Sequence, residues 1–459
     1  MEFSHVYFVG IGGIGMSAIA RYFHHAGKLV AGYDRTATPL TRELESEGIA
    51  VHYSDDTALI PTPFRDKSHT LVVYTPAIPV DHTELVWFRR EGFELVKRSQ
   101  VLGVIARDKR VMAVAGTHGK TTVTTMTAWF NRVITGGGSA FLGGISKNFD
   151  SNLVLGDGDR LAVEADEFDR SFLQLYPDVA VITAVDADHL DIYGDYASVR
   201  AAFSAFASQI KPGGALVLKN SVEIDLPQEG LTVYRYGYDT PCDFYARNVR
   251  MIEGGSALFD LVCPDRVVAD CHTGIPGWVN VENTIAAAAL VWCAGGFDDD
   301  RLREAIASFR GVRRRFDFYL NTPQIVYMDD YAHHPEELRA AITSLRGMFP
   351  GRTLTVLFQP HLYTRTRDFA AEFAASLSLA DRVLLLPIYP ARELPIEGVN
   401  SEMLLRQITV PHSLIQKEEI LPFVQTADLD VLVTFGAGDI DTFCEPIAQE
   451  LREKYAIRP

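Results

Sequence analysis

The stretch Gly116-Thr117-His118-Gly119-Lys120-Thr121-Thr122 decides the fold, because it has the pattern of a loop that binds the phosphates of ATP. Five apolar residues, 111–115, precede it and predict a buried strand that leads into the loop. Such loops wrap backbone N–H groups around phosphates, while a Lys reaches the β- and γ-phosphates and a Ser or Thr hydroxyl binds Mg²⁺. Lys120 and Thr121 occupy those positions. Val114 replaces the usual first glycine, so the loop is the shorter GTxGKT variant.

A second glycine-rich turn lies near the N-terminus. Residues 5–9 predict a strand, the turn Gly10-Ile11-Gly12-Gly13-Ile14-Gly15 follows, and a helix over 16–26 and a strand over 29–33 come next. A GxGxxG turn lets the backbone approach a diphosphate at a helix N-terminus. Asp34 follows Gly15 by 19 residues, where an acidic side chain can hold a ribose hydroxyl. By itself the motif indicates an NAD-binding site. The alternative is a tight turn that needs glycine only for packing.

The length and the alternation of elements predict three α/β domains. A chain of 459 residues exceeds one ordinary core, because single cores stop growing near ~250–300 residues. The expected domains are 1–107, 108–317 and 318–459, the first two separated by the charged stretch 107–110. Strand-like runs alternate with helical patterns, which predicts largely parallel sheets with helices on both faces. The expected strands are 70–74, 95–97, 161–163, 179–183, 215–218, 325–328, 354–358, 383–388 and 431–435, and the expected helices are 196–210, 335–348 and 367–379.

Composition excludes several classes of protein. The net charge of −16 argues against a nucleic-acid partner, which usually needs a basic face. No apolar run approaches the ~18–20 residues that span a membrane. Five cysteines without a CxxC pair argue against structural zinc or a disulfide framework. No charged-then-apolar leader is visible at the start, so a cytoplasmic location is expected. The chain leaves open whether the protein is a monomer or a homodimer.

Acidic groups follow two strand-like runs after the phosphate loop. Glu164-Ala165-Asp166-Glu167 ends the run 161–163, where a carboxylate can ligate Mg²⁺, a hard cation that prefers oxygen. Asp186-Ala187-Asp188-His189 follows the run 179–183 and offers His189 as a further ligand. A lone histidine is more often structural, but its place beside a phosphate loop favours the metal role.

Three groups of charged residues lie late in the chain. They are Arg313-Arg314-Arg315-Phe316-Asp317, Asp329-Asp330-Tyr331-Ala332-His333-His334-Pro335 and His361-Leu362-Tyr363-Thr364-Arg365-Thr366-Arg367. The last two follow strand-like runs, so they should meet at the carboxyl edge of the third sheet, where α/β folds bind ligands. Arginine suits carboxylates and phosphates there, because its planar fork matches both. A solvated surface is the alternative for any single Arg, above all Arg367.

In this order, the segments resemble those of the Mur ligase family along the whole chain. The marks are GIGGIGMSAIA (10–20), AGTHGKTT (115–122), EADE (164–167), ADH (187–189), Asn280 with Asn283, RRFD (314–317), DDYAHHP (329–335) and FQPHLYTRTR (358–367). The first and last of these resemble the alanine-adding branch of the family. A branch that attaches a ready-made tripeptide to the same nucleotide sugar should differ at both.

The resemblance implies a Rossmann-like domain for a UDP-sugar, a central ATPase domain and a C-terminal Rossmann-like domain that binds the amino acid and part of ATP. It implies a UDP-sugar site at Gly12, Gly13, Ile14, Gly15, Met16, Asp34 and Thr75, and an ATP site at Gly116–Thr122, Asn283, Arg315 and Asp330. It implies Mg²⁺, with two ions expected, on Thr121, Glu164 and His189. The residues implied for alanine are Tyr331, His333 and Arg365, and the catalytic set is Lys120, Glu164, His189, His333, His361 and Arg365. Two residues depart from the family: Val279 stands where the family usually has His, and Leu362 stands where it often has Arg.

The implied reaction joins L-alanine to the lactyl carboxylate of UDP-N-acetylmuramate. The carboxylate would first become an acyl phosphate at the expense of ATP, with the charge neutralised by Mg²⁺ and Lys120. The alanine amine would then attack the acyl carbon after losing a proton to His333 or His361, and the residues leave this choice open. Closure of the third domain would keep water from the acyl phosphate.

Three other functions stay open on the sequence. A tripeptide-recycling ligase would use the same ATP chemistry on a different amine. An NAD-dependent oxidoreductase would rest on the first glycine motif alone and leave Gly119-Lys120-Thr121 unexplained. A regulatory ATPase would hydrolyse ATP without ligation, so formation of an amide product discriminates it from a ligase.

Overall fold

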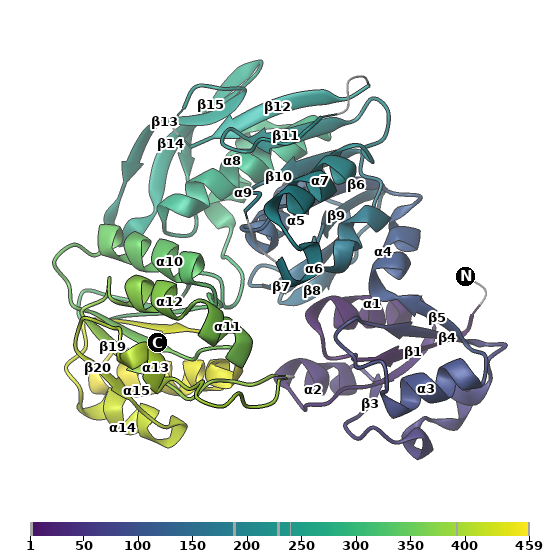
Figure 1. Ribbon diagram of the computed structural model, residues 1–459. Coiled ribbons are helices and arrows are strands. Elements are labelled where there is room, and N and C mark those ends of the chain that lie inside the picture. Colours follow the sequence, from purple (N-terminus) through teal and green to yellow (C-terminus); the bar gives the residue numbers. More distant parts are fainter. Residues whose placement is uncertain (1–2, 187–189, 227–229, 239, 392, 458–459) are drawn as a thin grey trace. The chain divides into compact units, whose positions relative to one another are not determined.

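A computed structural model describes residues 3–186, 190–226, 230–238, 240–391 and 393–457. Contacts between residues group the chain into two compact units (Figure 1). The first comprises residues 1–250, 257–275 and 280–310, and the second comprises 251–256, 276–279 and 311–459. The described strands form three sheets, and the first two sheets belong to the first unit. The domain boundaries expected at 107/108 and 317/318 stay a prediction.

The first sheet is parallel, with the strand order β3-β2-β1-β4-β5. The strands are β1 His5–Val9, β2 Leu29–Tyr33, β3 Ala50–His52, β4 Thr70–Tyr74 and β5 Glu94–Lys97, and the helices are α1 Ile14–His25, α2 Pro39–Ser46, α3 Thr83–Arg90 and α4 Arg98–Ala106. β1 and β4 are almost wholly buried, as expected of central parallel strands covered on both faces. The glycine-rich turn joins β1 to α1 at the carboxyl edge of this sheet.

The second sheet has the order β15-β14-β13-β12-β11-β10-β6-β9-β7-β8. Its strands are β6 Arg110–Ala115, β7 Ser139–Ser146, β8 Ser151–Val154, β9 Arg160–Glu164, β10 Val179–Ile182, β11 Ala215–Lys219, β12 Thr232–Gly237, β13 Phe244–Met251, β14 Ala257–Cys263 and β15 Arg266–His272. Its helices are α5 Lys120–Thr135, α6 Leu190–Tyr193, α7 Tyr196–Ala207, α8 Trp278–Cys293 and α9 Asp299–Ser308. β6 lies between β9 and β10, so the carboxyl ends of these three strands meet at one edge.

The third sheet, in the second unit, has the order β16-β17-β21-β18-β19-β20. The strands are β16 Asp317–Asn321, β17 Val326–Asp330, β18 Leu354–Phe358, β19 Arg382–Leu385, β20 His412–Leu414 and β21 Val431–Phe435. The helices are α10 Pro335–Met348, α11 Tyr363–Asp368, α12 Ala370–Leu377, α13 Glu402–Leu405, α14 Ile420–Thr426 and α15 Cys444–Lys454. All pairings are parallel except that of β16 with β17.

One expectation about the helices was wrong. The single helix expected over 367–379 is two short helices, α11 and α12, that meet at Phe369. The start of α11 at Tyr363 has no sequence signal, because its threonines are weak helix formers and the segment has no apolar periodicity. The sheet of the middle region is largely parallel, as expected, and β14 and β15 form an antiparallel pair at one end of it. The alternating burial along β14 is typical of a strand with one covered face.

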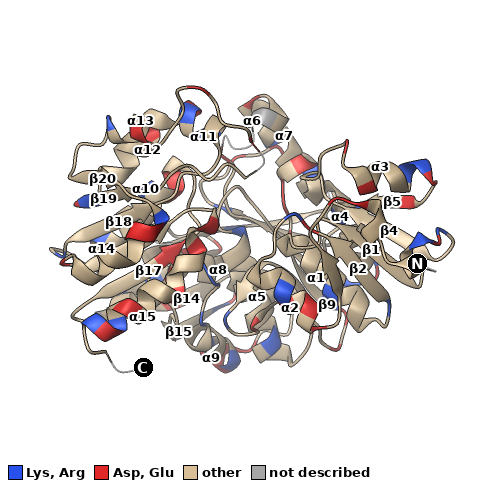
Figure 2. Cartoon of the chain, turned by 90° about the horizontal axis from the view of Figure 1, so that it is seen from below, with Lys and Arg blue, Asp and Glu red and all other residues tan. Residues whose placement is uncertain are grey.

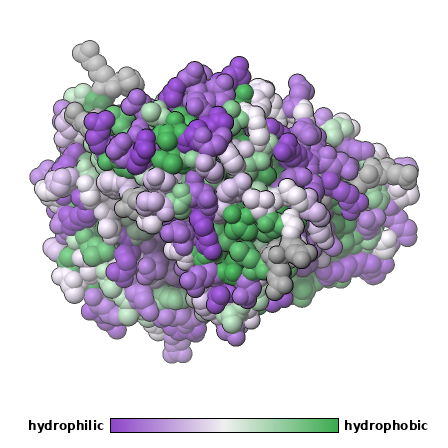
Figure 3. Space-filling view, turned by 90° about the horizontal axis from the view of Figure 1, so that it is seen from above, coloured by the Kyte–Doolittle hydropathy of each residue, from purple (hydrophilic) through white to green (hydrophobic). Residues whose placement is uncertain are grey.

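Charged and apolar side chains are interspersed on the surface. In the view of Figure 2, Lys and Arg accompany Asp and Glu on the same helices, as on α9 and α15. The face drawn in Figure 3 carries hydrophobic patches bordered by hydrophilic side chains. Among the described helices, none has both the length and the apolarity needed to cross a bilayer.

Candidate active site

The phosphate loop joins β6 to α5 at the carboxyl edge of the second sheet, as the sequence predicts. Gly116 has a φ of +135°, and a Cβ there would lie 2.2 Å from Thr183 Oγ1. The Thr183 hydroxyl donates to the carbonyl of His118 and, at 3.2 Å, to that of Ala115. Thr117 Oγ1 donates to Asp186 Oδ2 at 3.1 Å. The loop is therefore fixed by the residues that follow β10.

Lys120, the first residue of α5, is held by its own loop and by a buried carboxylate. Its Nζ donates to the Gly116 carbonyl and to Glu167 Oε1, both at 2.8 Å. The Glu167 side chain is 1% exposed and that of Lys120 is 14% exposed. Burial disfavours the ammonium, but the Glu167 carboxylate, with two other carboxylates nearby, outweighs it and raises the pKa of Lys120. Glu167 had no role in the sequence-based prediction, although it stands in the predicted acidic segment.

Glu164 lies at the end of β9, level with Val114 of β6, and its carboxylate occupies the space above Gly143. A Cβ at position 143 would lie 2.0 Å from Glu164 Oε2, so this glycine makes room for the carboxylate. Thr121, the second residue of α5, is buried beside the loop. A carboxylate and a hydroxyl are donors that suit Mg²⁺, which usually takes one or two carboxylates together with phosphates and water.

No group of three or more His, Cys, Asp or Glu side chains suited to a metal occurs among the described residues. His189, the other expected ligand, lies outside the described residues.

Asn283 brings a helix far along the chain to the phosphate loop. It lies in the second turn of α8, and its Oδ1 would be 3.3 Å from a Cβ at Gly119. Its Nδ2 donates to Asn280 Oδ1, one turn earlier, at 3.3 Å. The predicted ATP residues of the first unit, Gly116–Thr122 and Asn283, therefore lie together.

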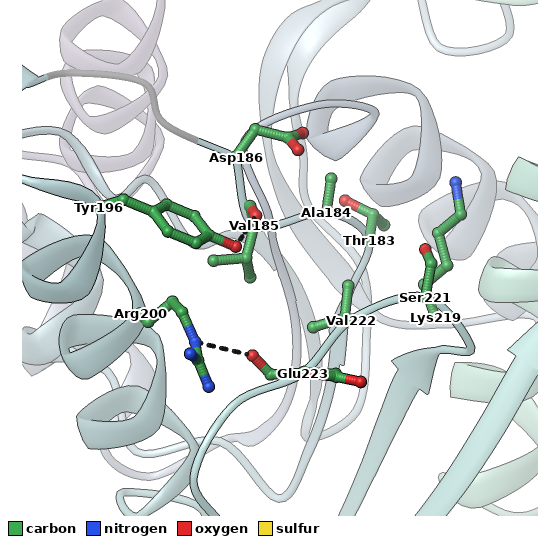
Figure 4. A pocket seen from close by; sticks show the side chains of 10 residues that line it. All are labelled: Thr183, Ala184, Val185, Asp186, Tyr196, Arg200, Lys219, Ser221, Val222 and Glu223. Atoms are coloured by element: carbon green, nitrogen blue, oxygen red, sulfur yellow. Dashed lines mark hydrogen bonds between the residues drawn. The ribbon is translucent and has the colours of Figure 1, made fainter.

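A polar pocket of about 330 Å³ lies at the carboxyl ends of β10 and β11 (Figure 4). Thr183 and Asp186, which hold the phosphate loop, are part of its wall. Tyr196 and Arg200 of α7 line the other side, where Arg200 Nε donates to the Glu223 carbonyl at 3.1 Å. Lys219 of β11 is paired with Glu282 at 2.9 Å. The pocket extends the polar surface beside the phosphate loop.

The N-terminal turn between β1 and α1 is held by a contact between Gly12 and Asp34. Gly12 N–H donates to Asp34 Oδ2 at 2.8 Å, and a Cβ on Gly12 would lie 2.6 Å from Thr41 Cγ2. Thr75 lies against Gly10, at the end of the neighbouring strand β4. Gly13 is the N-cap of α1, and Ile14, Gly15 and Met16 form its first turn. The structure thus brings the predicted UDP-sugar residues together, and it shows that Asp34 shapes the turn.

In the second unit, Asp330 ends β17 and accepts two backbone hydrogen bonds, from Phe316 N at 2.6 Å and Ala332 N at 2.8 Å. Burial raises the pKa of Asp330 to about 6, and the Arg315 charge opposes this shift. The guanidinium carbon of Arg315 lies 5.0 Å from the centre of the Tyr331 ring. Arg315, Asp330 and Tyr331 therefore form one cluster, as expected.

His333 adjoins this cluster and faces the segment after β18. Its ring centre lies 5.9 Å from that of His361. Its Nδ1 is 3.0 Å from the Tyr331 carbonyl and 3.5 Å from Glu337 Oε2. Burial lowers the pKa of His333, Glu337 opposes this shift, and Arg365 adds to it. The buried Nη1 of Arg365 has no hydrogen-bond partner within the described part of the chain, so it can receive an anion.

Leu362 departs from the family and adopts a backbone conformation that is unusual for leucine. Its φ is +71° and its side chain is buried at the start of α11. Val279, the other departure, is exposed on α8. Neither aliphatic side chain can donate a hydrogen bond, which a His or an Arg at these positions could do.

A phosphate loop at the carboxyl edge of a largely parallel sheet, in a chain whose three sheets are all of the α/β kind, is typical of an ATP-dependent enzyme of the phosphoryl-transfer class. Three family models match consecutive parts of the chain: "Mur ligase family, catalytic domain" over residues 5–110, "Mur ligase middle domain" over 114–291 and "Mur ligase, glutamate ligase domain" over 314–438. The chain belongs to the Mur ligase family.

Relatives and solved structures resemble the chain along its whole length. UDP-N-acetylmuramate–L-alanine ligase of Parabacteroides distasonis is 50% identical over 449 residues, which is 97% of either chain. The protein of the same name from Phocaeicola vulgatus is 48% identical over 98% of either chain. The crystal structure of UDP-N-acetylmuramate-alanine ligase from Thermotoga maritima matches with a TM-score of 0.80 at 27% identity, covering 98% of this chain and 99% of that one. The three-domain α/β fold is confirmed.

Proposed function

We propose that the protein joins L-alanine to the lactyl carboxylate of UDP-N-acetylmuramate, with ATP as the energy source, in the synthesis of peptidoglycan precursors. The observation that carries the proposal is the full-length likeness, at 44–50% identity, to relatives named UDP-N-acetylmuramate–L-alanine ligase. The phosphate loop, the Glu164 carboxylate and the basic cluster of the second unit supply the groups that such a reaction needs. We place the reaction in the cytoplasm, where ATP is available.

In the first step, an oxygen of the lactyl carboxylate attacks the γ-phosphorus of ATP, which gives an acyl phosphate and ADP. The backbone N–H groups of Gly116–Thr122 and the Lys120 ammonium bind the phosphates and stabilise the charge on the transferred group. Asn283, Arg315 and Asp330 bind the rest of ATP, and the turn Gly12–Met16 with Asp34 and Thr75 binds the UDP-sugar. Thr121, Glu164 and His189 would hold Mg²⁺, with two ions expected. When bound, Mg²⁺ would neutralise the charge of the phosphates.

In the second step, the alanine nitrogen attacks the acyl carbon and phosphate leaves. We assign the general base to His333 rather than His361. The Nδ1 of His333 points at the Tyr331 carbonyl, which requires a proton on that nitrogen and leaves Nε2 free to accept one. The lowered pKa keeps the ring neutral near pH 7, as a base must be. Arg365, with its buried Nη1, and Tyr331 hold the alanine carboxylate.

The test is product formation by the purified protein with ATP, Mg²⁺ and UDP-N-acetylmuramate. With L-alanine we expect phosphate release and a product heavier by one alanyl residue in mass spectrometry, and neither with the Lys120→Ala variant. Release with the tripeptide and not with L-alanine would replace our proposal by the recycling ligase. Phosphate release without any amide product would indicate the regulatory ATPase.

A further inference from the structure

Arg98 lies against the N-terminal glycine turn, although no sequence motif includes it. It is the first residue of α4, which follows β5 directly and packs against α1 (Figure 1). A Cβ built on Gly15 would be 2.9 Å from Arg98 Nη1 and 3.4 Å from Cζ. The guanidinium therefore fills the space that a side chain at position 15 would take. The glycine at this position makes room for an arginine beside the first turn of α1.

The other side of the same guanidinium faces the acidic segment of the phosphate-loop domain. Arg98 Nη2 is 3.5 Å from Asp166 Oδ2, and the two side chains are 20% and 37% exposed. The second oxygen of Asp166 accepts the N–H of Phe168 at 3.1 Å, which fixes the carboxylate. The next residue, Glu167, holds Lys120. Arg98 thus lies between the glycine turn and the segment that contacts the phosphate-loop lysine.

We propose that Arg98 binds the diphosphate of the UDP-sugar and that Asp166 competes with the diphosphate for it. The proposal rests on the proposed function, which places the diphosphate at Gly12–Met16. A diphosphate at this helix N-terminus lies beside the guanidinium, whose planar fork matches phosphate oxygens. The ion pair with Asp166 is long and partly exposed, so it stabilises little and a diphosphate can displace it. Binding of the sugar nucleotide then releases Asp166 next to Glu167 and Lys120.

A neighbouring ion pair offers a matched control. Lys97 Nζ is 2.9 Å from Asp169 Oδ2 and joins the same two segments of chain. The three atoms nearest to a Cβ built on Gly15 all belong to Arg98, and none belongs to Lys97. Replacing Lys97 therefore removes an ion pair between these two segments of chain and leaves the side chain beside Gly15 in place.

The experiment is calorimetric titration of the full-length protein with UDP-N-acetylmuramate, UDP and uridine. For Arg98→Ala we expect the affinity for UDP-N-acetylmuramate and UDP to fall by about 10-fold or more, as for loss of a charge-assisted phosphate contact. Arg98→Lys should restore part of this loss. Asp166→Asn should raise the affinity for both, and should have no effect in the Arg98→Ala background. Lys97→Ala should bind all three as the unchanged protein does.

Uridine separates a phosphate contact from a folding effect, because it lacks the diphosphate. Its binding should not respond to Arg98→Ala, so an equal loss for uridine and UDP would overturn the inference. An Arg98→Ala variant that binds UDP as tightly as the unchanged protein would overturn it too. Two other results would contradict the proposed function itself. One is that the unchanged protein does not bind UDP-N-acetylmuramate. The other is that Gly12→Ala, whose new side chain must displace Thr41 and Asp34, binds UDP-N-acetylmuramate as the unchanged protein does.

Discussion

The ammonium group of Lys120 lies in a buried ion pair with Glu167. Removing one partner of a buried pair leaves the other charge uncompensated and typically costs about 3–5 kcal/mol, whereas removing both costs less than the sum. We therefore expect Glu167→Gln to lower the thermal stability strongly. The double variant Lys120→Met/Glu167→Gln should lose less stability than the two single variants together. Thermal unfolding of the four proteins measures this, and additive losses would contradict the pair.

The pKa of the His333 ring gives a second prediction. The Glu337 carboxylate raises the pKa of His333 against the effect of burial, so its removal should lower that pKa further. A base is active when neutral. The acid limb of kcat against pH, measured at saturating alanine, should therefore move to lower pH in Glu337→Gln, and this variant should keep more of its activity on the acid side of the profile.

Glu336→Gln is the matched control for this shift. Glu336 precedes Glu337 on α10, is exposed, and pairs with Arg339 at 3.5 Å. It should leave the pH profile unchanged. If the two variants behave alike, or if His361→Gln removes the acid limb while His333→Gln keeps it, the base is not His333.

At the scale of the element, the sequence predicts best where one local rule decides the structure. The strands 29–33, 354–358 and 431–435 and the helix 335–348 were predicted with the bounds that the structure has. The three strands are mostly apolar, and the helix has Pro335 at its first position with acidic residues in its first turn. The helix expected over 367–379 failed because an apolar period cannot locate the break at Phe369.

The two ends of α5 allow a prediction about the phosphate loop. Gly119 precedes the helix with a φ of +79°, and Gly136 follows it with a φ of +77°. Alanine at either position should lose a similar amount of stability, about 1–2 kcal/mol, because both backbones are left-handed. Only Gly119 lies against Asn283, whereas the space beside Gly136 is open within 4 Å among the described residues.

Gly119→Ala should therefore weaken ATP binding, and Gly136→Ala should not. Titration with a non-hydrolysable ATP analogue measures the affinity, and thermal unfolding confirms that the two stability losses are comparable. Equal affinities in the two variants would mean that the contact between the loop and α8 has no part in nucleotide binding.

At the scale of the whole molecule, the sequence predicts which segments carry chemistry and misses the contacts that join them. Lys120, Glu164 and His333 stand in motifs that have a chemical meaning by themselves. Glu167 stands in such a motif too, but its bond to Lys120 depends on how two strands pair. Arg98 stands in no motif, and its place beside Gly15 follows only from the packing of α4 on α1. Contacts between residues far apart in sequence have no local signature, so they had to come from the structure.

The residues proposed to act on ATP belong to both compact units, with Lys120 and Asn283 on the first and Arg315 and Asp330 on the second. An acyl phosphate open to water would hydrolyse before the amine attacks it, so we expect the second unit to close on the first when ligands bind. Small-angle scattering should show a smaller radius of gyration with UDP-N-acetylmuramate and a non-hydrolysable ATP analogue than without them. Arg315→Ala should weaken this compaction, since it removes an ATP contact of the second unit. The same envelope in all states would contradict closure.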